Sequence, residues 1–114
     1  MQRGEIWMVD IQPRGSAPGH EQIGDRPAII VQHQTANQST VVIVPVTKQL
    51  EAQRFLGAVG VVQPSPGNGL SLPSIVLTNQ VQVCDVRRFR RKCGRLEAAH
   101  LSRLETELKA LLNL

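Results

Sequence analysis

The amino-acid sequence predicts a mainly β fold with one C-terminal helix, in which a small, strongly bent sheet or barrel packs against that helix. Short β-branched runs separated by turn residues fill most of the chain, and helical spacing of leucines is found only near its end. The chain has 114 residues, of which 41% are hydrophobic, and this size and composition are typical of one hydrophobic core. We therefore expect residues 1–114 to form a single domain.

Six short runs predict the strands. Each run is bounded by Gly, Pro or polar turn residues, and most are rich in Val and Ile. They are Glu5–Ile11, Ala28–Gln32, Thr40–Val46, Phe55–Val62, Ser74–Thr78 and Gln80–Asp85. A long loop containing Pro13 and Gly15 follows the first run. Pro45 lacks a backbone donor, so it predicts that the third run lies at the sheet edge or ends there.

Leucines near the C-terminus predict the helix. Leu101, Leu104, Leu108 and Leu111 are separated by three, four and three residues. This spacing places them on one face of a helix from about Glu97 to Asn113. We expect that face to pack on the core, and we expect the basic cluster just before the helix to lie on an exposed connection.

The net charge of the chain is confined to one stretch. Thirteen Lys and Arg against nine Asp and Glu give a formal charge of +4. Six of the basic residues and no acidic residue lie in residues 87–95, which we call the basic segment. Such a stretch binds phosphate, binds an acidic protein segment, or is a solvated basic turn. Aromatic residues make up only 3% of the chain, which argues against a base-stacking surface.

Several function classes find no support in the sequence. No apolar run is long enough for a membrane helix and no signal peptide is recognisable, so we expect a cytoplasmic protein. The three histidines are scattered, and Cys84 and Cys93 do not form a CxxC pair, so neither a metal nor another cofactor is predicted. The glycines match no nucleotide-binding fingerprint. Cofactor-free chemistry remains.

The densest polar cluster precedes the second predicted strand, in the stretch GHEQIGDRP. Pro27 restricts Arg26 to an extended conformation, which projects a planar guanidinium suited to phosphate oxygens. The alternative is an ion pair of Arg26 with Glu21 or Asp25 that ties the loop. Thr47 leaves a similar choice, because its hydroxyl either binds a phosphoryl oxygen or caps the turn into Lys48.

Four motifs, taken in order, resemble the MazF/PemK (Kid-like) toxins of bacterial type II toxin–antitoxin pairs. They are RGEIWMVDIQP, GHEQIGDRPAIIVQ, VVIVPVT and SIVLTNQVQVCD, and together they span nearly the whole chain. The resemblance implies a compact SH3-like barrel of the CcdB/PemK type and a homodimer. It also implies a sequence-specific, metal-independent endoribonuclease that cleaves single-stranded RNA and is inhibited by a cognate antitoxin with an acidic tail.

The resemblance also implies site residues. The catalytic positions of the family correspond to Arg26, Thr47 and Glu21, and Gln80 matches a glutamine that contacts RNA bases. With Gln80 we assign three more polar residues to RNA binding, namely Asn79, Lys48 and Gln22. The sequence departs from the family at His20, where relatives usually have Ser, and at Gln82, where a basic residue is common.

RNA supplies its own nucleophile, the 2′-OH, so such a nuclease needs a base, an acid and charge stabilisation at the phosphorane. We expect Arg26 to stabilise charge at the scissile phosphate and His20 or Glu21 to act as the base, leaving 2′,3′-cyclic phosphate and 5′-OH ends. The basic segment extends the RNA track or attracts the antitoxin tail. The alternative functions are a gyrase-poisoning toxin of the same fold and a catalytically silent nucleic-acid-binding module.

Overall fold

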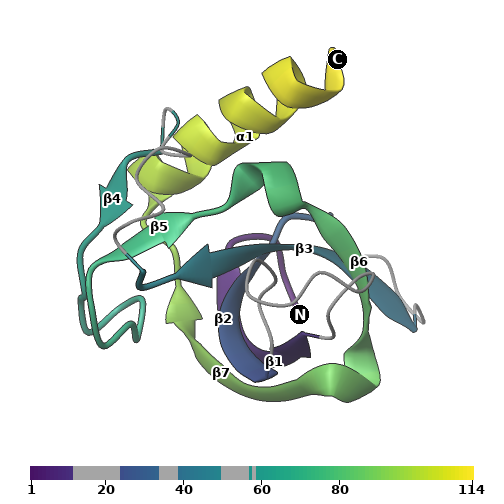
Figure 1. Cartoon of the computed structure of the whole chain (residues 1–114), viewed down its shortest axis with the longest axis vertical. Helices are drawn as coiled ribbons and strands as arrows, with labels where there is room; N and C mark the ends of the chain where they lie inside the picture. The colour runs from purple at the N-terminus through teal and green to yellow at the C-terminus, as the bar shows by residue number, and fades with distance from the viewer. Residues whose placement is uncertain (12–23, 34–38, 50–56, 58) are drawn as a thin grey trace.

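The computed structural model of the chain describes residues 1–11, 24–33, 39–49, 57 and 59–114. Most of its regular structure is β, and one α-helix ends the chain, which confirms the predicted class (Figure 1). The strands are β1 (Glu5–Ile11), β2 (Gly24–Ile30), β3 (Thr40–Thr47), β4 (Val61–Val62), β5 (Ser74–Val76), β6 (Gln82–Asp85) and β7 (Phe89–Arg95). The helices are the 3-10 turns η2 (Thr78–Gln80) and η3 (Val86–Arg88), and α1 (Ala98–Leu112).

The strands form one strongly curved sheet. Its order is β4-β5-β3-β2-β1-β7, and β6 pairs with β3 beside this path. The first half of β3 pairs with β6 and its last two residues pair with β5, so this long strand pairs with two different strands in turn. Figure 1 shows the strands curving around a ring, with α1 crossing one side of it. The fold is thus a half-barrel that carries its helix outside.

Successive side chains of the central strands belong alternately to two separate apolar clusters. In β3, Val41 and Ile43 belong to one apolar cluster, whereas Val44 and Val46 belong to the other. This follows from the period of two in a strand, which sends successive side chains to opposite faces. The cluster that includes Val44 also contains Leu104 of α1, so it lies between sheet and helix.

Helix α1 matches its prediction closely. Leu104 is fully buried, and Leu101 and Leu108 pack against the same core. Leu111 is 49% exposed, because the last turns of the helix project beyond the sheet (Figure 1). The leucine face therefore packs on the core over its first three members only. No helix in the described ranges has the length and apolar character of a membrane span.

The basic segment is not the exposed connection that the sequence predicts. Its residues from Phe89 onward form β7, which pairs antiparallel with β1. β7 is the last strand of the sheet path, so among the described strands it pairs along one edge only, and its Arg90, Arg91 and Lys92 are all exposed. Only Phe89 and Cys93 supply apolar contacts to the cores, too few to mark a strand in the sequence.

The prediction for Pro45 is also wrong. β3 is an inner strand, and Pro45 lies opposite Ala28 of β2. Pro45 stands where β3 changes partner from β6 to β5, and there its carbonyl accepts a hydrogen bond from Leu77 N–H (2.9 Å). The missing donor of a proline is tolerated at such a break in the ladder. Of the predicted strand Phe55–Val62, residues 55, 56 and 58 lie outside the described residues, and β4 covers its last two residues.

Candidate active site

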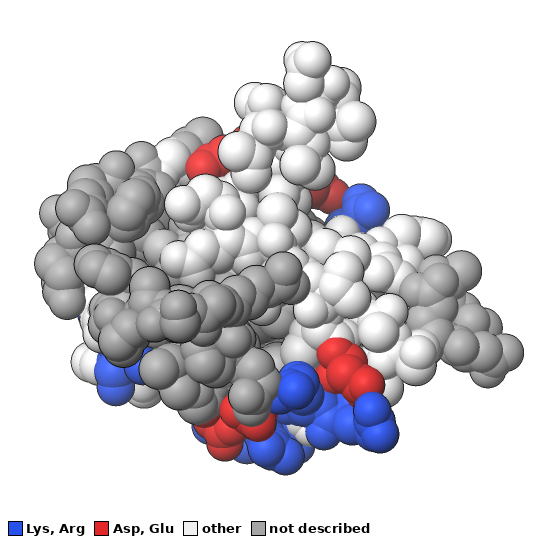
Figure 2. Space-filling model, turned by 45° about the vertical axis from the view of Figure 1, so that its right-hand side comes forward, with Lys and Arg blue, Asp and Glu red and all other residues white. Residues whose placement is uncertain are grey.

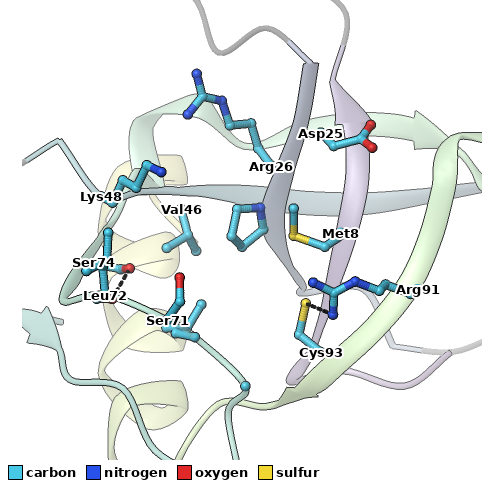
Figure 3. A pocket seen from close by; sticks show the side chains of 13 residues that line it. Met8, Asp25, Arg26, Val46, Lys48, Ser71, Leu72, Ser74, Arg91 and Cys93 are labelled. Carbon is cyan, nitrogen blue, oxygen red and sulfur yellow. Dashed lines mark hydrogen bonds between the residues drawn. The ribbon is translucent and has the colours of Figure 1, made fainter.

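A pocket of about 180 Å³ opens between four strands and the segment after β4 (Figure 3). It gathers cations from three different strands, which are Arg26 of β2, Lys48 just after β3 and Arg91 of β7. Its remaining walls are formed by Met8, Asp25, Pro27, Val46, Gly69, Leu70, Ser71, Leu72, Ser74 and Cys93. The pocket thus joins an electropositive rim to an apolar floor.

Arg26 is placed in the pocket by the pairing of β2. It lies opposite Val9 of β1, and Pro27 after it lies opposite Met8. Figure 3 shows Asp25 and Arg26 leaving β2 on opposite sides. Asp25 instead approaches Arg90, with 3.5 Å between Oδ1 and Nε, and so forms an ion pair with the basic segment. Glu21, the other expected partner of Arg26, lies outside the described residues.

Strand pairing relates Arg26 to the end of β3 only indirectly. The register of β2 with β3 runs from Ile30 opposite Ile43 to Ala28 opposite Pro45. Beyond Pro45, β3 pairs with β5, where Thr47 lies opposite Ile75. The pairing of Arg26 with Thr47 that the family resemblance implies therefore stays a prediction.

Thr47 itself is nearly buried, with 2% of its surface exposed. Its Oγ1 accepts a hydrogen bond from Gln49 N–H at 3.1 Å, which is the turn-capping role that the sequence offered as one alternative. A hydroxyl that accepts this bond retains its proton for donation. Thr47 is not among the residues lining the pocket, so its contact with a phosphoryl oxygen stays a prediction.

The pocket also carries polar groups besides Arg26, in two settings. Lys48 is exposed, and Figure 3 shows its ammonium group turned toward Arg26. Ser74 Oγ donates to the Leu72 carbonyl at 2.8 Å and is thereby committed to its own loop. The exposed Ser71 points its hydroxyl into the pocket (Figure 3). Lys48 and Ser71 are thus available to an incoming anion.

The wall around Ser71 is held by a buried polar network. Asn68 is fully buried, and its Oδ1 accepts from the N–H groups of Ser65 (3.0 Å) and Leu70 (2.9 Å). Its Nδ2 donates to the Gln63 carbonyl at 2.9 Å and to the Glu97 carboxylate at 3.2 Å. Burial raises the pKa of Glu97, but hydrogen bonds from Ser65 and Asn68 outweigh burial and lower it. The network ties the loop to the start of α1.

Two glycines bring this loop against β7. A Cβ on Gly69, whose φ is +70°, would collide with the Cys93 carbonyl, and a Cβ on Gly94 would collide with Gly67. Arg95 N–H donates to the Gly67 carbonyl at 2.8 Å. Only glycine permits this approach, which places the loop beside Cys93 and closes the lower side of the pocket.

Most cations of the basic segment bind carboxylates rather than facing solvent freely. The N–O distances are 2.9 Å for Arg87–Asp85, 3.7 Å for Arg88–Asp10, 3.4 Å for Arg90–Asp10, 3.5 Å for Arg90–Asp25 and 3.1 Å for Lys92–Glu5. Figure 2 shows acidic and basic side chains interleaved over this part of the surface. The hydrogen bonds from Arg87 lower the pKa of Asp85 to about 2.

Glu5 is the most buried carboxylate of this set. Burial raises its pKa, but hydrogen bonds from Trp7 Nε1 (3.0 Å), Gln2 N–H (3.0 Å) and the Lys92 ammonium outweigh that effect and bring the pKa down to about 2. The carboxylate is therefore charged at neutral pH. It joins the start of β1 to β7 rather than taking part in the pocket.

Two of the other predicted site residues, Asn79 and Gln80, do not line the pocket. Three more, His20, Glu21 and Gln22, lie outside the described residues, so their roles stay predictions. Asn79 and Gln80 lie in η2, where the Gln80 carbonyl accepts from Gln82 Nε2 at 3.2 Å. Arg91 and Ser71 line the pocket although sequence reasoning missed them. The closest signals were the PSPGNG turn and the basic segment, and neither reveals what it packs against.

This arrangement suits an anion with several oxygens. Guanidinium and ammonium groups form charge-assisted hydrogen bonds with phosphate, and two or more of them around one site stabilise the extra charge of a phosphorane. Within the described ranges, no three His, Cys, Asp or Glu side chains gather as a metal site requires.

Comparison with known proteins gives a consistent answer. Residues 2–112 match the family model described as PemK-like, MazF-like toxin of type II toxin-antitoxin system. Endoribonuclease MazF9 of Mycobacterium tuberculosis is 31% identical over 121 residues, covering 100% of this chain and 98% of that protein. Endoribonuclease PemK of Escherichia coli is 35% identical over 89 residues, covering 76% of this chain and 62% of that protein.

Solved structures share the fold. A crystal structure of MazF from Deinococcus radiodurans superimposes with a TM-score of 0.75 at 24% identity, covering 100% of this chain and 97% of that chain. A mycobacterial endoribonuclease in complex with its cognate antitoxin gives a TM-score of 0.68 at 19% identity, covering 100% and 94%. These similarities confirm the fold type implied by the sequence motifs.

Proposed function

The chain belongs to the PemK-like, MazF-like family of toxins of type II toxin–antitoxin systems, and from this premise we propose that it cleaves single-stranded RNA at specific sequences without a metal ion. Its enzyme class is endoribonuclease, as in its named relatives. The observation that carries the proposal is the convergence of Arg26 and Lys48 on one pocket, with Thr47 next to Lys48 at the end of β3.

In the proposed reaction the ribose 2′-oxygen attacks the adjacent phosphorus. A base removes the 2′-OH proton, the 2′-O–P bond forms and the P–O5′ bond breaks, and the departing O5′ takes up a proton. The products are a 2′,3′-cyclic phosphate and a 5′-OH. We assign two roles to Arg26, which stabilises the negative charge of the phosphorane and donates the proton that O5′ takes up, since a guanidinium carries its proton at neutral pH.

The remaining roles follow the family motifs. Thr47 donates its hydroxyl to a phosphoryl oxygen, and Glu21 or His20 serves as the base. Lys48 contacts the backbone, and three polar side chains contact bases, namely Gln22, Asn79 and Gln80. Because the RNA provides the nucleophile itself, these groups suffice without a metal-bound water.

We also propose a cognate antitoxin with an acidic tail, a homodimer and a cytoplasmic site of action. The solved complexes of Deinococcus radiodurans MazE with MazF support the antitoxin partner. The gyrase-poisoning alternative has less support, because the matched relatives are named endoribonucleases.

The test is cleavage of naked RNA by the purified chain in EDTA. We expect cuts at a defined sequence, with 2′,3′-cyclic phosphate and 5′-OH ends, and a loss of about 10²–10³-fold in kcat for Arg26→Ala. Arg103→Ala, on an exposed position of α1, is the matched control and should cleave like wild type. Cleavage that stops in EDTA would contradict the metal-free mechanism, and full activity of Arg26→Ala would contradict the site.

The base is tested separately by pH. If His20 is the base, His20→Ser removes the limb of the pH–rate profile that lies near the usual imidazole pKa. An unchanged profile would leave Glu21 as the base.

A further inference from the structure

Five of the six cations of the basic segment fall into two groups, and the sixth, Arg95, is exposed at the end of β7. Four of the five bind carboxylates of β1, β2 or β6, namely Arg87, Arg88, Arg90 and Lys92. Arg91 has a different partner, because its Nη1 donates to Cys93 Sγ at 3.8 Å and no described carboxylate lies within ion-pair distance of it. A thiol is a weak acceptor, so the guanidinium of Arg91 is poorly satisfied.

Strand pairing explains this separation. Arg91 lies opposite Met8 and Lys92 lies opposite Trp7, so the two side chains leave β7 on opposite faces. Lys92 reaches Glu5, whereas Arg91 reaches the pocket that Met8 also lines. A register shift between Met8 and Val9 leaves Arg90 unmatched in the ladder, and Arg90 turns to Asp10 and Asp25.

Arg91 stands across the pocket from Arg26 and Lys48. In Figure 3, Arg26 and Lys48 share one side of the pocket, and Arg91 and Cys93 occupy the other side. The hydroxyl of Ser71 faces the space toward Val46. Groups on two sides of one pocket can hold two anionic groups of a single ligand. Consecutive phosphates of an RNA strand are such a ligand.

We propose that Arg91 binds the RNA phosphate next to the scissile one, so that the pocket holds two consecutive phosphates. This inference rests on the proposed function, in which Arg26 and Lys48 hold the scissile phosphate. The planar fork of Arg91 exchanges its thiol acceptor for two phosphate oxygens, which are far stronger acceptors. Arg91 is a substrate-binding residue in this scheme and has no part in bond making.

RNA is favoured over an acidic peptide as the occupant. Arg91 shares its pocket with Arg26, the residue assigned to the scissile phosphate, whereas the cations on the other side of the segment are already bound to carboxylates. A peptide docking on those cations would have to displace these acids. A phosphate at Arg91 displaces only the contact with Cys93.

The test compares Arg91→Gln with Arg87→Gln, a matched control on the exposed and carboxylate-bound side. The probe is a fluorescently labelled 2′-O-methyl RNA, which binds but offers no nucleophile. Arg91→Gln should raise Kd about tenfold and lower the salt slope of log K by about 0.7, the value of one phosphate contact in a single strand. Arg87→Gln should match wild type, and Arg91→Lys should recover part of the affinity.

A second measurement locates the phosphate. Cleavable RNAs each carry one neutral methylphosphonate at a different linkage around the cut. The penalty of Arg91→Gln, seen in KM more than in kcat, should vanish when the neutral linkage is the one beside the scissile phosphate. A penalty equal at all linkages would indicate a structural defect and overturn the proposal.

Two other results separate the hypotheses. If wild type cleaves RNA while Arg91→Gln keeps its RNA affinity and loses affinity only for a polyglutamate peptide, the occupant is an acidic peptide and the proposal is wrong. If wild type cleaves nothing but its binding of 2′-O-methyl RNA depends on Arg91, the nuclease proposal fails and the phosphate contact stands.

Discussion

Two groups of cations in β7 and η3 share one stretch of sequence and have opposite electrostatic settings. Arg90 and Lys92 bind the carboxylates of Asp10, Asp25 and Glu5, whereas Arg91 lines the pocket beside a thiol. The difference comes from strand pairing, since β1 supplies acids to one group and Met8 to the other. A run of positive charge in the sequence is therefore a poor guide to where positive charge is free for a ligand.

The acidic partners come from the part of the chain before the basic segment. Residues 1–86 hold five basic and six acidic groups, a sum of −1, and residues 87–95 hold six basic groups. The pairing of β1 with β7 and β2 sets these two stretches side by side. Asp10 and Asp25 face each other across β1 and β2, and Arg90 reaches both, which relieves the repulsion of two like charges.

The largest expected effect distinguishes an arginine that lines the pocket, Arg26, from one that is bound to carboxylates, Arg90. Arg26→Lys keeps the charge but loses the planar fork, so we expect kcat to fall about 10²-fold. Arg90→Lys keeps the ion pairs with Asp10 and Asp25 and should cleave like wild type. Single-turnover cleavage of one RNA by the two variants makes the comparison. Equal losses would mean that both guanidinium groups act on the substrate.

The sequence predicted the parts of the fold that local patterns encode. The limits of β1, β3 and α1 agree with their predicted ranges within about two residues, because apolar period and turn residues are properties of neighbouring positions. β7 was missed, since its three consecutive residues Arg90, Arg91 and Lys92 are all charged and exposed, so the strand carries no apolar alternation. β7 forms because it pairs with the distant strand β1, and a charged stretch of sequence does not reveal such pairing.

The site divides in the same way. Arg26 follows from a motif and lines the pocket together with Lys48, whereas Thr47, the residue expected to act with Arg26, does not line it. Arg91 and Ser71 join the pocket through contacts between distant segments. The wall that carries Ser71 depends on Asn68 meeting Glu97, 29 residues later, and on Gly69 fitting against Cys93. Each of these contacts requires the sheet to be closed first, so residue type and spacing could not predict them.

The second expected effect concerns the stability that the buried ion pair of Glu5 with Lys92 contributes. The drop in the pKa of Glu5 from 4.5 to about 2 means that the folded state is stabilised by its charged form above about pH 4.5 and loses this contribution as pH falls towards 2. Glu5→Gln removes the charged partner of Lys92, so we expect a loss of about 1–2 kcal/mol at pH 7. Urea unfolding at pH 7, 4.5 and 3 measures it.

Glu105→Gln is the control for this prediction, because Glu105 forms an exposed ion pair with Arg3 (2.9 Å). It should change stability by less than about 0.5 kcal/mol. The deficit of Glu5→Gln should shrink as the pH falls from 4.5 to 3. A deficit that stays constant over this range would show that Glu5 acts through packing and not through its charge.

The smallest expected effect tests whether the ion pair of Arg90 with Asp25 influences RNA binding in the pocket. Asp25 lines the pocket and is neutralised by Arg90, so Arg90→Gln leaves a carboxylate facing the incoming phosphate. We expect RNA affinity to fall about two- to threefold at low salt, and the loss to fade at high salt, where exposed charges are screened. The double variant Arg90→Gln/Asp25→Asn should regain wild-type affinity, because the repulsive group is gone. If the double variant binds as weakly as Arg90→Gln, then Arg90 contacts the RNA directly, and the division of the basic segment into bound and available cations would have to be redrawn to include it.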